Sequence, residues 1–197
     1  MLQDSKGSLE AVSDPEYLAL AALDRGKPEE ALSILMRAYG TAVYRYCRQM
    51  AGSDDLAEEI QQLTFVQAYE GLAKFARRSS LRTWLFGIAR HRCLDLNKMN
   101  QRRRRRFGPI DEVPEMPAPG GSVEDRLAED SRTRALERCL QMLVPRVRAA
   151  VLLRFQQGLS YPEIARISGE KPPALQVRVA RALPVLRRCM EEKGMAP

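Results

Sequence analysis

Residues 145–186 read PRVRAAVLLRFQQGLSYPEIARISGEKPPALQVRVARALPVL, and their turn-forming residues divide them into short helical segments. Pro145 suits the first turn of a helix, and Gly158 suits the residue after its end. Ser160 and Glu163 have the spacing of a capping box, in which each side chain bonds the other residue's backbone N–H. The stretch therefore predicts a helix from Pro145, a turn at Gly158 and a short second helix behind the cap.

A third helix is expected from residues 172–174, after a turn at Gly169. Apolar residues three and four positions apart form one side of it: Leu175, Val179, Ala182 or Leu183, and Leu186. The other side carries Gln176, Arg178 and Arg181, residue types that bond bases and phosphates. A helix-turn-helix fits this pattern, and so does a plain three-helix bundle with a basic exterior. The short middle helix and its tight turn favour the helix-turn-helix.

Pro184 falls inside the expected third helix. Proline lacks a backbone N–H and clashes with the carbonyl four residues earlier, so the sequence predicts that the helix kinks or ends there.

Composition places the chain among small helical proteins. It has 197 residues, 45% of them hydrophobic and 6% aromatic, and no run alternates as a strand does. The net charge of +7 is distributed in blocks: residues 72–106 carry 12 basic groups and 1 acidic group, and residues 131–197 carry 13 and 5. Two basic blocks separated by an acidic spacer favour nucleic acid as a partner, although a solvated surface would also fit either block.

Breaker residues divide the chain into two domains. Residues 107–123, FGPIDEVPEMPAPGGSV, hold four prolines and three glycines and cannot continue a helix. We therefore expect an all-α protein of two small helical domains, at 14–106 and 131–197, joined by a flexible linker over 107–130. A helical pattern resumes near Val123, and residues 1–13 are expected to be flexible.

The first domain is predicted to hold four helices. They begin at Asp14, at Pro28, after Gly52 and near Ser80, and the second is expected to end near Met50. Apolar stripes at helical spacing should face the core: Ala31, Leu35, Ala38, Ala42 and Tyr46; Leu56, Ile60 and Leu63; and, in the second domain, Val147, Val151, Leu152 and Phe155.

No motif predicts a catalytic centre, a metal or a cofactor. The four cysteines, Cys47, Cys93, Cys139 and Cys189, lie about 46–50 residues apart, which fits no metal motif. They are expected to be buried or half-exposed thiols in a reducing compartment. The N-terminus lacks the pattern of a signal peptide, and no stretch approaches a membrane span. The expectation is a soluble, cytoplasmic protein.

Several strings resemble the extracytoplasmic-function (ECF) group of bacterial sigma factors, over roughly residues 25–190. In AEEIQQLTF, at 57–65, the matching residues are Glu59, Gln62 and Phe65. The resemblance implies that this helix binds the clamp helices of core RNA polymerase. Glu58, Glu59 and Gln62 would form an exposed acidic face suited to a basic coiled coil, with Phe65 packed inward.

A second string, from Phe75 through Arg82-Thr83-Trp84-Leu85, is similar to the part of the family that captures the opened −10 promoter strand. Strand capture requires cations for phosphates and a platform for an unstacked base. Trp84 suits such a platform, but its spacing with Leu81 and Leu85 favours the core. His91 stands where the family has Asn. The residues that the resemblance implies for this contact are Arg77, Arg78, Ser79, Ser80, Arg82, Trp84, Arg90, His91, Asp95, Lys98, Arg102, Arg103 and Arg104.

The helix-turn-helix is similar to the family's −35 reader almost position by position until the third helix. There Gln176 and Val177 replace polar or basic contact residues, which predicts an unusual −35 sequence. The implied contacts are Ser160, Tyr161, Gln176, Val177, Arg178 and Arg181. The resemblance also implies an anti-sigma factor as a partner.

The leading hypothesis is a non-enzymatic sigma factor that binds core polymerase, selects promoters and helps to melt them. Two alternatives remain open at this point. One is a sigma-like interaction protein that no longer initiates, which Gln176, Val177 and Pro184 motivate. The other is a helix-turn-helix regulator that binds duplex DNA alone, in which the acidic helix at 57–65 has no role.

Overall fold

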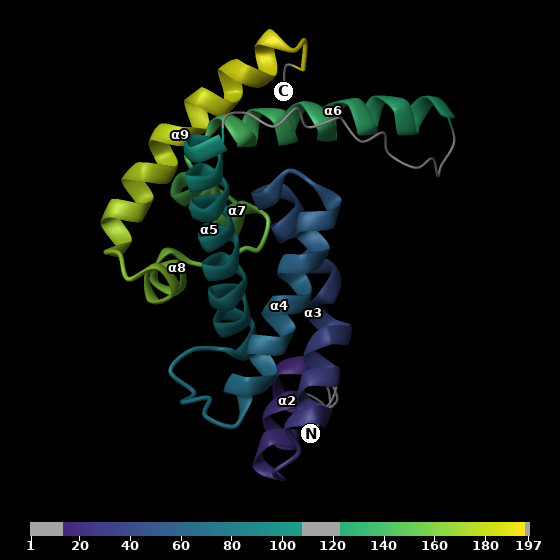
Figure 1. Cartoon of the computed structure of the whole chain (residues 1–197), viewed down its shortest axis with the longest axis vertical. Coiled ribbons are helices and arrows are strands. Elements are labelled where there is room, and N and C mark those ends of the chain that lie inside the picture. The colour runs from purple at the N-terminus through teal and green to yellow at the C-terminus, as the bar shows by residue number, and fades with distance from the viewer. Residues whose placement is uncertain (1–13, 108–122, 196–197) are drawn as a thin grey trace, which may run out of the picture.

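The computed structural model describes residues 14–107 and 123–195, and for residues 97, 100–107 and 123–130 only the backbone. Within this part of the chain every regular element is a helix, which confirms the expected all-α class (Figure 1). The helices are α2 (Pro15–Asp24), α3 (Pro28–Ala51), α4 (Asp54–Leu72), α5 (Leu81–Phe107), α6 (Val123–Met142), α7 (Pro145–Phe155), α8 (Tyr161–Ser168) and α9 (Pro172–Glu192).

Local signals place the helix starts where the sequence predicts them. The Asp14 side chain accepts a hydrogen bond from the Glu16 N–H at 3.0 Å, and Ser53 caps α4 in the same manner. The capping box of α8 is complete: the Ser160 N–H donates to Glu163 at 2.8 Å, and the Glu163 N–H donates to the Ser160 hydroxyl at 3.4 Å. Each cap satisfies N–H groups that the first helical turn leaves without a partner.

Helices α2–α4 and the first half of α5 pack into one bundle around large buried side chains. Tyr46, Met50 and Phe86 are fully buried, and the Tyr46 and Phe86 rings meet edge to face with centroids 5.8 Å apart. Two stripe residues were wrongly predicted, because Ala38 and Leu63 are exposed. Packing selects a neighbouring stripe on each of these helices. That stripe contains Val43, Cys47 and Met50 on α3, and Ala57, Thr64, Phe65 and Ala68 on α4.

Helices α7–α9 form the predicted helix-turn-helix. The buried stripe of α9 is Leu175, Val179, Ala182 and Leu186, so of the two residues left open the structure selects Ala182 over Leu183. Phe155, predicted to be buried, is 59% exposed, because α7 ends there and its last turn faces solvent.

The expectation for Pro184 is partly wrong, because α9 continues through it to Glu192. Pro184 and Ala180 both lie on the exposed side of the helix. Water can therefore bond the Ala180 carbonyl that proline leaves without a backbone donor, so the helix is not forced to end.

The segments expected to be flexible fall largely outside the described residues, which exclude 1–13 and 108–122. The structure assigns both ends of the expected linker to helices, since Phe107 is the last residue of α5 and α6 begins at Val123. That start coincides with the point where the helical pattern was expected to resume.

The two halves of the chain pack against each other. Helix α5 lies between α3 and α4 on one side and α7–α9 on the other, while α6 crosses one end of the assembly (Figure 1). A single cluster of buried side chains runs through both halves, from Tyr46 and Phe86 to Leu153 and Ile164.

Candidate nucleic-acid and partner-binding faces

The outer side of α4 is an exposed face with both acidic and apolar residues. Glu58, Glu59 and Gln62 are exposed, whereas Phe65 is buried, as the sequence predicts. Leu63 and Val66, which are 41% and 56% exposed, lie beside them. Glu59, Gln62, Leu63 and Val66 follow the i, i+3, i+4, i+7 pattern of one helical stripe. Sequence reasoning assigned Leu63 to the core and missed Val66, although the same spacing rule would have grouped all four. We call these four residues the α4 stripe.

The loop before α5 is fixed by a carboxylate from the start of the chain's first described helix. Glu16 of α2 accepts hydrogen bonds from the backbone N–H groups of Leu81 and Arg82, the second at 3.2 Å. The Ser80 hydroxyl accepts from the Thr83 N–H at 3.0 Å. These acceptors cap α5 and hold the preceding loop in place.

Two of the predicted DNA-binding arginines extend from this loop. Arg77 and Arg78 are exposed, and Arg77 forms an ion pair with Asp24 of α2. Arg77 has a φ of 54°, a left-handed conformation that costs energy in a residue with a side chain. Ser79 and Ser80 lie between these arginines and α5, so the predicted loop residues share one surface.

Trp84 lies at the edge of the core. Its ring is half-buried and 5.3 Å from the ring centroid of Phe75. A Cβ on Gly71 would approach the Trp84 ring to 2.9 Å, so α4 and α5 can pack this closely only because residue 71 is glycine. The structure therefore gives Trp84 a packing partner on each side.

The second half of α5 carries a line of charged residues. Asp95 accepts from exposed His91 at 3.0 Å and from Lys98 at 3.2 Å. Arg90 is partly buried, and burial lowers the pKa of its guanidinium. Arg102, Arg103 and Arg104 lie on the same helix near its C-terminal end, and their side chains are outside the described residues.

In the helix-turn-helix the predicted contact residues fall into two groups. Gln176, Val177 and Arg181 are exposed on α9. The others have partners within the protein: Ser160 closes the cap of α8, Tyr161 stacks with Arg154 at 5.2 Å, and Arg178 forms an ion pair with Glu170.

A cleft between the two halves holds several of the candidate −10 residues, which sequence reasoning did not anticipate. Its volume is about 500 Å³. Arg90, His91 and Lys98 of α5 line one wall, and Arg146 and Glu170 from the second half line the other. The cleft therefore holds positive charge from both halves of the chain.

Hydrogen bonds from residues outside the cleft also join the two halves. Arg82, predicted to bind phosphate, donates instead to the carbonyl of Gln157. The Thr83 hydroxyl donates to the Glu163 carboxylate at 3.0 Å. Burial of Glu163 acts to raise its pKa, but hydrogen bonds from Ser160 and Thr83 outweigh it, and the pKa is lowered.

Arg148 of α7 also joins the two halves and was missed. Its side chain is buried and donates to the carbonyls of Leu140, Gln141 and Leu143 at the end of α6. It also donates to the carbonyl of Met50 in α3 at 2.7 Å. A cation placed among carbonyls at helix C-termini neutralises their partial negative charge. Burial lowers its pKa, as it does for Arg90.

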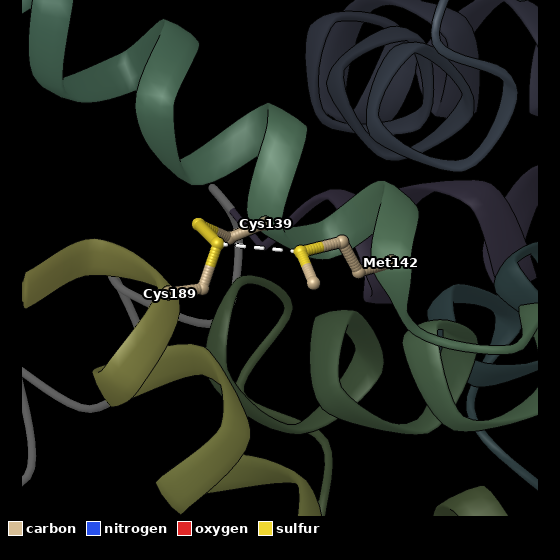
Figure 2. Close-up of a disulfide and its surroundings, with 3 residues drawn as sticks. All are labelled: Cys139, Met142 and Cys189. Carbon is tan, nitrogen blue, oxygen red and sulfur yellow. Dashed lines mark hydrogen bonds between the residues drawn. A yellow bond between two sulfur atoms is a disulfide. The ribbon is translucent and has the colours of Figure 1, made fainter. Parts of the chain in front are cut away.

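The cysteine expectation is half wrong. Cys47 and Cys93 are buried thiols, and the hydrogen bond between them, together with burial, raises the pKa of Cys93 well above its ordinary value. Cys139 and Cys189 instead form a disulfide between α6 and α9 (Figure 2). A separation of 50 residues gives no local signal of such a pair.

The described part of the chain has neither a cluster of metal ligands nor a membrane-spanning helix. Among residues 14–107 and 123–195 no three His, Cys, Asp or Glu side chains are grouped as metal ligands would be. No helix in the same residues combines the length and the apolar character needed to cross a membrane.

Comparisons with known proteins match both halves. Family models for Sigma-70 region 2 and Sigma-70 region 4 match residues 35–106 and 133–183. The ECF RNA polymerase sigma factor SigC of Mycobacterium tuberculosis (strain CDC 1551 / Oshkosh) is 31% identical over 180 residues, covering 86% of this chain and 89% of SigC. The ECF sigma factor SigX of Bacillus subtilis (strain 168) is 28% identical over 165 residues, covering 83% and 85%.

Two solved structures have a similar fold. The sigma factor RpoE in complex with the anti-sigma factor NepR from Bartonella quintana has a TM-score of 0.66 at 25% identity, covering 79% of this chain and 94% of RpoE. CnrH in complex with the cytosolic domain of CnrY also has a TM-score of 0.66, at 24% identity, covering 91% and 99%.

Proposed function

The chain belongs to the ECF group of RNA polymerase sigma factors, and we propose that core polymerase and promoter DNA bind separate surfaces of it. Core polymerase binds the outer side of α4. Promoter DNA binds the loop before α5, the length of α5 and the exposed side of α9. The protein acts through binding energy, without a catalytic group, and works in the cytoplasm, where the bacterial chromosome is transcribed.

The observation that carries this proposal is the exposed α4 stripe. Glu59 and Gln62 offer charge and hydrogen bonds to a basic helical partner, while Leu63 and Val66 offer apolar surface that this chain leaves uncovered. An interface needs such a combination, because charge steers the encounter and burial of apolar area supplies affinity. A regulator that bound only duplex DNA would have no use for this surface.

The closed cleft requires that promoter binding be accompanied by domain separation. By their names the −10 and −35 elements lie about 25 base pairs apart, or roughly 85 Å of duplex. In the closed arrangement, in which Arg90 of α5 and Arg146 of α7 line the same cleft, the two halves are in direct contact, and we take this spacing to be too short for both elements. We infer that the hydrogen bonds of Thr83 and Arg148 break before both promoter elements are bound.

An anti-sigma factor is the expected regulator of this step. RpoE and CnrH are similar structures that were solved in complex with NepR and with the cytosolic domain of CnrY. By analogy, we propose that an inhibitor of this chain binds the closed arrangement and prevents its separation.

Run-off transcription tests the proposed function. Purified protein is added to bacterial core polymerase with a library of genomic fragments, and the transcripts are sequenced. We expect discrete start sites preceded by a shared pair of elements, and loss of these transcripts with Arg178→Ala/Arg181→Ala. Core binding without any specific transcript would instead support a sigma-like interaction protein, for which the exposed Val177 on α9 is the motivating feature.

A further inference from the structure

The Cys139–Cys189 disulfide joins α6 to α9 close to the C-terminal end of each helix. Its Cα atoms are 5.8 Å apart, and it links the end of α6 to the last two turns of α9 (Figure 2). The Met142 sulfur lies 3.4 Å from the Cys189 sulfur, a close contact between atoms that carry no hydrogen. Both cysteines are themselves buried, at 1% and 5% exposed, so the bond lies inside the contact between the two helices.

A small thiol can approach the bond from the Cys189 side. Cys189 lines a surface depression of about 200 Å³ together with Met142, Pro184, Arg188 and Glu192. Met142, the other sulfur at this rim, is 66% exposed.

The other two cysteines provide an internal contrast. Cys47 and Cys93 are fully buried between α3 and α5, and the raised pKa of Cys93 disfavours its thiolate. Cys189 is also buried, but it belongs to the oxidised pair and lines an opening. Exchange chemistry therefore has one accessible site among the four cysteines.

The disulfide holds the end of α9 in place where a backbone hydrogen bond is missing from the helix. Pro184 donates no backbone hydrogen bond to Ala180, so the last turns of α9 are tied less firmly to its first half. Leu186 and Cys189 are the residues that bury this end of the helix. Without the disulfide, Leu186 is the main remaining anchor.

Through α6, the disulfide is also connected to the first half of the chain. The Gln141 side chain donates to the Gln49 carbonyl of α3 at 2.9 Å, and Glu137 lies 3.6 Å from Arg48. These contacts fix the end of α6 on the first half of the chain. A disulfide from α6 to α9 thus attaches the DNA-facing helix to the contact between the two halves.

We propose that Cys139–Cys189 is a reversible thiol–disulfide exchange site, which in its oxidised form holds α9 on α6 and stabilises the closed arrangement. A dithiol attacks the Cys189 sulfur, the Cys139 thiolate leaves, and the second thiol of the reagent resolves the mixed disulfide. The products are two protein thiols and one oxidised dithiol. The reverse reaction needs a disulfide oxidant such as oxidised glutathione. The exchange stands without the proposed function, and only its effect on promoter binding rests on that function.

Thiol trapping tests the exchange itself. The native, air-oxidised protein is treated with dithiothreitol, alkylated with iodoacetamide and mapped by peptide mass spectrometry. We expect dithiothreitol to expose two additional alkylation sites, Cys139 and Cys189, while Cys47 and Cys93 stay unmodified until the protein is denatured. A bond that is absent after air oxidation, or that resists reduction in the native state, contradicts the proposal.

Hydrogen exchange and interdomain distance test the consequence without DNA. On reduction, we expect the amides of residues 185–192 to exchange about tenfold faster. We also expect the two halves to separate more often, as measured with labels at the exposed positions Tyr69 and Arg187. The Cys139→Ser/Cys189→Ser variant should behave as the reduced protein under all conditions. A Cys47→Ala control should keep the full redox response. Equal exchange rates in the oxidised, reduced and double-variant proteins would show that the disulfide does not hold α9 on α6, whatever the transcription assay shows.

Discussion

The α4 stripe and the DNA-facing side of α5 are neighbours in sequence but differ in how far the folded protein exposes them. On α4, Glu59, Gln62 and Val66 are exposed and make no use of the second half of the chain. On α5, Arg82 and Thr83 are engaged by residues of that second half, and Arg90 is partly buried beside it. The α4 stripe is open to solvent, whereas the second half of the chain covers part of the α5 side.

This difference indicates an order of events. Core polymerase can bind the exposed α4 stripe, as proposed above, without rearrangement, whereas the proposed DNA contacts of α5 first require the two halves to separate. A ligand shifts such an equilibrium only by its preference for one state, so polymerase must bind the separated arrangement more tightly. Substitutions that weaken the contacts between the two halves, or the α4 stripe, test this order separately.

The largest expected effect comes from Arg148, which fastens the covered side. Arg148→Met keeps the apolar stem but removes the guanidinium donor from the carbonyls of Met50, Gln141 and Leu143. Leaving several buried carbonyls unsatisfied should reduce the free energy of unfolding by about 3–4 kcal/mol. Urea denaturation measures this, with Arg146→Met, an exposed position on the same helix, as the control. Equal losses in both variants would show that Arg148 has no special role.

The next effect concerns the exposed side. Glu59→Lys/Gln62→Lys should weaken binding to core polymerase about 100-fold, roughly 2.7 kcal/mol, because like charges would then face a basic coiled coil. Fluorescence titration with core polymerase measures it, and stability should be unchanged because both positions are exposed. Glu191→Lys, an exposed change of the same kind on α9, should bind normally. Wild-type affinity in the double variant would place the polymerase elsewhere.

A smaller effect is expected from Thr83, which bonds Glu163 of the second half. Thr83→Val keeps the shape of the side chain and removes one hydrogen bond, worth about 1 kcal/mol, or about a fivefold shift toward the separated state. Interdomain distance measured with a pair of fluorophores should report this shift, together with tighter binding to promoter DNA. Thr41→Val, the same substitution at an exposed position on α3, is the matched control. A shift equal to that of the control would remove Thr83 from the closing contacts.

The smallest effect is a dependence on pH. The pKa of Glu163 is lowered in the folded protein, so its contribution is present above the unfolded value, about 4.3, and is lost as pH falls through the folded value. Separation of the halves should therefore increase below about pH 4.5 and stay constant from pH 5 to 7. In Glu163→Gln the acidic limb of this profile should be smaller, since the residue no longer titrates.

The sequence predicts those parts of the fold that depend on a few neighbouring residues. The capping box at Ser160, the buried stripe of α9 from Leu175 to Leu186 and the helix start at Pro28 all follow from spacing within one or two turns. The two polar residues of the α4 stripe, Glu59 and Gln62, were also predicted to be exposed. Its apolar residues were not, because spacing alone does not decide which of two adjacent stripes faces the core.

Tertiary structure decided everything that joins residues far apart in the chain. The carbonyl partners of Arg148 come from α3 and α6, the Thr83–Glu163 bond crosses 80 positions, and Cys139 meets Cys189 across 50. Propensity and capping act through bonds within a single helix, whereas these contacts depend on which helix faces which after the apolar stripes have been buried. The sequence therefore determined the helices and the chemistry carried on their faces, and packing alone determined which face is covered.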